Sequence, residues 1–105
     1  MDISYLGLAL VESWGIETST KWKMENPALG QCGVTALVVQ EYLGGEIVKT
    51  LIGEMWHFYN KIGDNYIDFT VSQFDPAIDY KPVISNRLEA FEDTNINQYR
   101  YLTKE

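Results

Sequence analysis

The stretch that decides the fold runs from residue 31 to residue 45 and reads Gln31-Cys32-Gly33-Val34-Thr35-Ala36-Leu37-Val38-Val39-Gln40-Glu41-Tyr42-Leu43-Gly44-Gly45. The pair of Gly residues at its end is typical of a helix stop. Its β-branched residues would also suit a strand. However, residues 31–43 make a long strand, and apolar side chains on nearly every side are typical of a buried helix. The pattern therefore predicts a central helix over residues 31–43.

The chain before this helix divides into two parts. Residues 2–13 carry apolar side chains at helical spacing, which predicts a first helix. Residues 14–30 are irregular, because the step Asn26-Pro27 disfavours helix at Asn26. We expect Trp14 and Trp22 in this segment to pack onto the rest of the domain, since a buried Trp is more often core than ligand cage.

The chain after the central helix reads as strands and then short helices. Residues 46–70 alternate in polarity like a strand meander, with a turn at Gly63-Asp64-Asn65. Pro76 and Pro82 bound a loop. The whole order predicts an α+β domain in which an antiparallel sheet packs on the central helix.

Two further segments are predicted near the C-terminus. Asn86 with Glu89 three residues later resembles a capping box, which predicts a short helix through Phe91. A further turn or helix is expected from Thr94 to Leu102.

Length and charge limit the function. The 105 residues form a single domain, 1–105, with a net charge of −7 and a pI near 4.5. Such a surface repels phosphate backbones and anionic headgroups, so we expect neither nucleic acid nor membrane as a partner. One Cys forms no intrachain disulfide, and a free thiol fits the reducing cytosol. The N-terminus lacks the basic region of a signal peptide, and no apolar run approaches the roughly 20 residues of a membrane span, so a cytoplasmic location is expected.

Three residue types associated with thiol catalysis occur in order along the chain. The single Cys, Cys32, lies where the central helix begins, the single His, His57, lies in the middle of a strand, and Asp68 lies on the next one. A thiolate attacks an acyl carbon, an imidazole takes and returns the proton, and a carboxylate orients the imidazole. Since a helix N-terminus stabilises a thiolate, the sequence predicts a lowered pKa for Cys32.

The hairpin register decides whether His57 and Asp68 can meet. With Ile62-Gly63 as the two loop residues they pair directly, and with Gly63-Asp64 they form a diagonal pair. Both registers place the side chains on one face, whereas a three-residue loop without a bulge separates them. The sequence leaves these alternatives open.

A thiol site would also need donors for an oxyanion and a wall for a substrate. The backbone N–H of Cys32 is one natural donor. Gln31 and Asn26 are candidates for a second donor, and Trp22 and Trp56 are candidates for the wall of a cleft.

Each of these residues also has a simpler interpretation. A lone Cys is most often a small buried hydrophobe, and a lone His is most often structural. The acid pairs Glu92-Asp93 and Asp75/Asp79 are expected to be solvated surface. One Cys and one His cannot form a closed zinc site, and neither a P-loop nor a dinucleotide fingerprint is present, so no metal or cofactor is expected.

Several blocks of this chain resemble the YunG-like family of small bacterial proteins. They are the residues from Asn26-Pro27 to Gln40, Tyr42 to Ile47, His57-Phe58-Tyr59-Asn60, Asp68-Phe69-Thr70 with Ser72-Gln73-Phe74, and Arg100-Tyr101-Leu102. The motif order of the family is similar to that of papain-like and transglutaminase-like thiol enzymes, in which the Cys opens a helix and the His and Asp lie on following strands. The resemblance implies Cys32 as nucleophile, His57 as base and acid, and Asp68 as orienting residue. The letters Gly-Gln-Cys-Gly also occur in papains, but there the nucleophile is a later Cys.

The sequence therefore predicts a minimal papain-like (cysteine-hydrolase-like) α+β domain. The expected function is a thiol-dependent hydrolase or acyltransferase acting on an amide or thioester of a small molecule or peptide. The alternative is a non-catalytic protein-interaction module on the same fold, which would bind a protein partner through the acidic surface or the Trp-rich segment. The small size favours the alternative, and the presence of all three residue types favours the enzyme.

Overall fold

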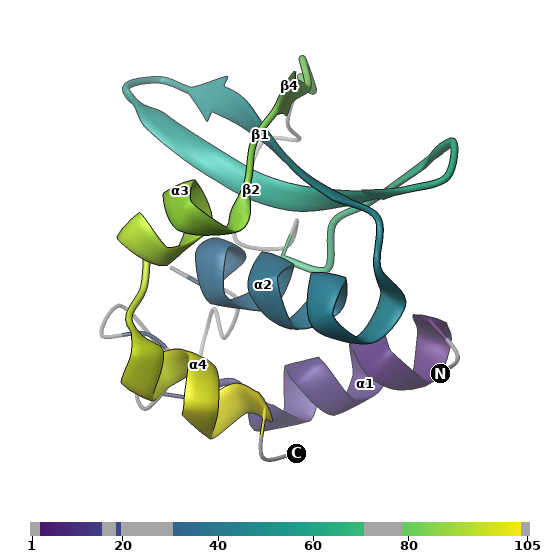
Figure 1. Ribbon diagram of the computed structural model, residues 1–105, viewed down its shortest axis with the longest axis vertical. Helices are drawn as coiled ribbons and strands as arrows, with labels where there is room; N and C mark the ends of the chain where they lie inside the picture. Colours follow the sequence, from purple (N-terminus) through teal and green to yellow (C-terminus); the bar gives the residue numbers. More distant parts are fainter. Residues whose placement is uncertain (1–2, 16–18, 20–30, 71–78, 104–105) are drawn as a thin grey trace.

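The computed structural model describes residues 3–15, 19, 31–70 and 79–103 (Figure 1). Its elements in chain order are α1 (Ile3–Ser13), α2 (Cys32–Leu43), β1 (Glu46–Ile52), β2 (Met55–Ile62), β3 (Asn65–Ile67), β4 (Val83–Ile84), α3 (Arg87–Glu92) and α4 (Ile96–Thr103). The expected α+β class with an antiparallel sheet is confirmed. The helices expected over 2–13, 31–43, 86–91 and 94–102 are all present to within about two residues at their described ends.

Helix α2 is the centre of the molecule. Its residues from Cys32 to Val39 are buried, and Figure 1 shows it between the sheet on one side and α1 and α4 on the other. This burial explains why its apolar side chains are not confined to one stripe. The helix ends at Gly44, whose positive φ of 73° suits a residue without Cβ and whose N–H donates to the Gln40 carbonyl.

The sheet has the order β3-β2-β1-β4, and all its neighbouring strands are antiparallel. Strands β2 and β3 pair Asn60 with Ile67 and Ile62 with Asn65. This is the register of a two-residue loop at Gly63-Asp64, one of the two registers that bring His57 and Asp68 to the same face. Asp68 itself lies one residue beyond the end of β3.

Strand β4 was not expected from the sequence, which placed only a loop before Asn86. Its two residues, Val83 and Ile84, pair with Lys49 and Val48 of β1. Both are exposed, so no alternation of buried and exposed side chains marks the strand in the sequence.

The two faces of β2 have different surroundings. Phe58 packs in a core cluster with Cys32 and Ala36, and Asn60 donates a side-chain hydrogen bond of 3.0 Å to the Ala36 carbonyl of α2. Because successive side chains of a strand alternate between faces, His57 and Tyr59 point to the face away from α2. Both are almost completely buried there.

Candidate thiol site

His57 and Asp68 form a close, buried polar pair in the candidate site. Strand β2 supplies His57, and the turn into the segment after β3 supplies Asp68. The distance from His57 Nε2 to Asp68 Oδ2 is 2.6 Å, and the two side chains are only 1% and 9% exposed. The expected hydrogen bond between these residues is confirmed, but Asp68 lies one residue beyond β3 and not on the strand, because β3 ends at Ile67. Their catalytic role stays a prediction.

The carboxylate of Asp68 is surrounded by further donors. Its Oδ1 accepts from the backbone N–H and the hydroxyl of Thr70 at 3.0 and 3.1 Å, and its Oδ2 accepts from the Tyr80 hydroxyl at 2.6 Å. Burial works to raise the pKa of Asp68, but the hydrogen bonds from His57, Tyr80 and Thr70 outweigh it and hold the pKa below its usual range. Asp68 is therefore a fixed anion beside the imidazole.

Tyr80 is a member of this site that the sequence did not indicate. The centroid of its ring lies 5.0 Å from that of Tyr59 in a T-shaped arrangement. The Tyr59 ring in turn stacks on the His57 ring, with 5.8 Å between the centroids. Burial, and then the hydrogen bond to Asp68, raise the pKa of Tyr80 well above its ordinary value, so its hydroxyl stays a donor. A Tyr in the loop between Pro76 and Pro82 carries no signal that would single it out.

Cys32 is the first residue of α2, as expected, and its side chain is buried. Its Sγ donates to Asp93 Oδ2 at 3.5 Å, and the same oxygen accepts from the Gly33 N–H at 3.0 Å. Burial first, and then the charge of Asp93, raise the pKa of the Cys32 thiol far above its ordinary value. The prediction of a lowered thiol pKa is therefore wrong for this conformation, because the thiol is buried and because a carboxylate occupies the helix N-terminus that would otherwise stabilise a thiolate.

The imidazole and the thiol lie on different faces of β2, because Phe58 packs with Cys32 whereas His57, the residue before it, points away from α2. A backbone hydrogen bond from Phe58, the residue after His57, acts on the Cys32 thiol, and so does the charge of Asp68. The direct approach of Sγ to the imidazole stays a prediction.

Asp93 is the second residue that the sequence did not identify. It was expected to be solvated surface together with Glu92, and the residue is indeed exposed overall, but its carboxylate bonds both the thiol and the helix N-terminus. It lies 61 positions after Cys32 along the chain, so no spacing rule relates the two.

The other expected site residues have mixed outcomes. Gln31 is completely buried, and its Nε2 donates to the Gly15 carbonyl at 3.5 Å, while its Oε1 has no hydrogen-bond partner within the described residues. Trp14 is core, as expected, and its Nε1 donates to Thr35 Oγ1 at 3.0 Å. Trp22 and Asn26 lie outside the described residues.

A groove of about 380 Å³ lies next to Asp93 and Phe58, two neighbours of Cys32, and Cys32 itself is not part of its lining. It is lined by Lys49, Glu54, Met55, Trp56, Phe58, Glu89, Glu92 and Asp93. Two of these residues, Phe58 and Asp93, contact Cys32. Trp56 forms part of the wall, in agreement with its expected position, and the Lys49 ammonium lies 4.3 Å from the centre of its ring.

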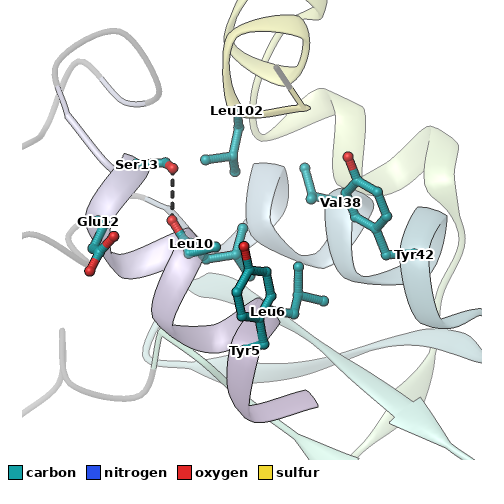
Figure 2. Close-up of a pocket in the computed structure, with 9 residues that line it drawn as sticks. Tyr5, Leu6, Leu10, Glu12, Ser13, Val38, Tyr42 and Leu102 are labelled. Carbon is teal, nitrogen blue, oxygen red and sulfur yellow. Dashed lines mark hydrogen bonds between the residues drawn. The ribbon is translucent and has the colours of Figure 1, made fainter. Parts of the chain in front are cut away.

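A second hollow of about 320 Å³ lies between α1, α2 and α4 (Figure 2). Its apolar lining includes Leu6, Leu10, Val38 and Leu102, and Ser13 at its rim donates to the Ala9 carbonyl of its own helix. None of the candidate thiol-site residues within the described ranges lines it.

No group of three His, Cys, Asp or Glu side chains among the described residues is arranged to hold a metal ion. No helix in the described ranges is both long and apolar enough to cross a membrane.

The fold and the site together define a small α+β domain with a helix opened by its single Cys and a buried His–Asp pair nearby. The family model described as YunG protein matches residues 2–105. Over 93 residues the chain is 52% identical to the Uncharacterized protein YunG of Bacillus subtilis (strain 168), and this match covers 89% of the chain and 81% of that protein. The chain belongs to the YunG family. No solved structure matches it.

Proposed function

We propose that this protein is a thiol-dependent hydrolase or acyltransferase with Cys32 as nucleophile, His57 as general base and acid, and Asp68 as the residue that orients the imidazole. The buried 2.6 Å pair between His57 and Asp68 carries this proposal. A buried anion that bonds one ring nitrogen fixes the tautomer and stabilises the imidazolium. The arrangement supports a minimal papain-like site.

The reaction follows from these roles. Because Nε2 of His57 bonds Asp68, the other ring nitrogen, Nδ1, is the one that takes the proton from Cys32 Sγ, and this step requires a rearrangement that brings the imidazole to the thiol. The thiolate attacks the acyl carbon, and His57 returns the proton to the leaving nitrogen or sulfur as that bond breaks. Water, or an acceptor amine or thiol, then attacks the acyl-cysteine, gives its proton to His57 and releases Cys32, which recovers the proton.

The start of α2 offers the charge stabilisation that this reaction needs. The N–H groups of the first turn of a helix have no partner within the helix, so they are natural donors to an oxyanion. The Cys32 N–H belongs to this turn, and the groove bounded by Phe58 and Trp56 gives a substrate a place beside it. Gln31 supports this role less well, since its amide nitrogen already donates to Gly15.

The experiment is acylation by activated thioesters and nitrophenyl esters, followed by intact mass. The proposal predicts one acyl group on the wild type, none on Cys32→Ser, and turnover that falls at least about a hundredfold in His57→Gln. Gln keeps a donor for Asp68, so circular dichroism should show that this variant stays folded. If wild type and Cys32→Ser acylate equally, or if His57→Gln turns over like wild type, the proposal fails.

One observation favours the interaction module. Leu51, Met55 and Trp56 at the end of the β1–β2 hairpin are exposed by 53%, 59% and 41%, and exposed apolar side chains grouped together are typical of binding surfaces. This surface lies apart from Trp14, which is buried and cannot serve a partner. A wild type that is folded but not acylated would support this second function.

A further inference from the structure

Asp93 contacts the proposed nucleophile in a way that opposes its reaction. The residue caps the C-terminus of α3, where its N–H donates to the Ala90 carbonyl at 3.1 Å. From there, its Oδ2 accepts both from Cys32 Sγ, at 3.5 Å, and from the Gly33 N–H, at 3.0 Å. One carboxylate oxygen therefore binds the thiol and the helix N-terminus together.

The backbone is shaped for this contact at Gly33. A Cβ on residue 33 would lie 2.5 Å from Asp93 Oδ2 and 2.9 Å from the Ala90 carbonyl oxygen. Real Cβ atoms do not approach other atoms so closely, so the carboxylate reaches the Gly33 N–H only because this residue has no side chain. The close packing of α3 on the start of α2 depends on the same Gly.

The contact has two chemical consequences. A thiolate at Cys32 would face the Asp93 carboxylate across a hydrogen-bond distance, and two like charges so close are unfavourable. The Gly33 N–H, which could otherwise donate to an oxyanion beside Cys32, is already bonded. In this conformation, the Cys32 thiol and the Gly33 N–H are both bonded to Asp93 and are not available to a substrate.

We propose that Asp93 is a gate on Cys32: in place, its carboxylate keeps the proton on the thiol and covers the Gly33 N–H, and when it turns into the neighbouring groove it releases both. This inference rests on the proposed function, because it assumes that Cys32 is the nucleophile. Asp93 lines the groove and is exposed as a residue, so its side chain has room to turn. A substrate group entering the groove is then what displaces it.

The test is the rate at which iodoacetamide alkylates the thiol at about pH 7. Because the chain has one Cys, every alkylated molecule reports Cys32. Asp93→Asn keeps the size of the side chain and an oxygen that can cap Gly33, but removes the charge. We expect alkylation at least about tenfold faster, since each unit by which the thiol pKa falls raises the thiolate fraction about tenfold.

The matched control is Glu92→Gln, which removes the same charge one residue earlier in the same groove and should leave the rate within about twofold of wild type. Asp93→Ser, which also offers a capping oxygen, repeats the test if the Asn variant is unstable. Equal rates for wild type and the folded Asp93 variants would overturn the gate, and so would equal acceleration by Glu92→Gln.

Alkylation of the Asp93 variant and acylation of the His57 variant together separate the gate from the proposed function. If Asp93→Asn changes nothing while His57→Gln abolishes acylation, the gate is wrong and the thiol site stands. If Asp93→Asn accelerates alkylation while His57→Gln leaves acylation unchanged, Asp93 controls the thiol but the catalytic pair is wrong.

Discussion

Replacing Asp68 with Ala should strongly destabilise the protein. The change leaves His57 Nε2 and both donors of Thr70 without their acceptor, and His57 and Thr70 are 2% and 1% exposed. Tyr80 loses a bond as well, but it is partly exposed and can turn to water. An unsatisfied buried donor costs about 1–3 kcal/mol, so we expect a loss of roughly 3–5 kcal/mol in the free energy of unfolding.

Urea and thermal unfolding at neutral pH measure this loss. Each kcal/mol of lost stability lowers Tm by about 4 °C or more in a domain of this size, so Tm should fall by at least roughly 12 °C. Asp79→Ala is the control, because that carboxylate is 87% exposed and lies 3.6 Å from an equally exposed Lys81 ammonium; it should change stability by less than about 0.5 kcal/mol. A loss below about 1 kcal/mol in Asp68→Ala would refute the argument that these donors depend on Asp68.

Three further predictions follow from single contacts. Gly33→Ala should lower Tm by several degrees despite the better helix propensity of Ala, because the new Cβ meets Asp93 and the Ala90 carbonyl; an unchanged or higher Tm would contradict the close packing. Trp14→Phe should lose about 1–2 kcal/mol of unfolding free energy, because it leaves the buried Thr35 hydroxyl without its donor, and a neutral result in urea unfolding would show that this bond is unimportant. The pKa of Asp68 is lowered in the folded protein, so its contribution to the free energy of unfolding is complete above the unfolded pKa of about 4 and is lost as pH falls through the lower folded value. Asp68→Asn should therefore flatten the acid side of the profile of stability against pH. An equally steep profile in the variant would argue against this contribution.

The features of the fold that depend on a local sequence pattern were predicted correctly from the sequence. Continuous apolar character followed by Gly44-Gly45 was enough to find α2 and to place Cys32 at its start. The turn residues Gly63-Asp64 limited the hairpin to a few registers, and the one observed brings His57 and Asp68 together. Alternation along a strand thus predicted a pair that lies 11 residues apart.

What the sequence could not predict depends on packing between distant segments. Asp93 reaches Cys32 only because α3 packs on the first turn of α2 at Gly33, and Tyr80 reaches Asp68 only because its loop lies over the face of β2 that carries Tyr59. Both residues looked like ordinary loop positions. The raised pKa of the Cys32 thiol has the same origin, since packing buries the thiol and brings the Asp93 carboxylate to the helix N-terminus.

The most direct test of the central claim is the ¹⁵N NMR spectrum of the imidazole, which belongs to the single His of the chain. The proposed mechanism puts the Nε2 proton in the bond with Asp68 and requires Nδ1 to reach Cys32. It predicts that Cys32→Ala shifts the Nδ1 resonance and leaves Nε2 protonated and nearly unmoved, while Asp68→Asn shifts Nε2. An Nδ1 resonance that does not respond to Cys32→Ala would contradict a proton exchange between the thiol and His57.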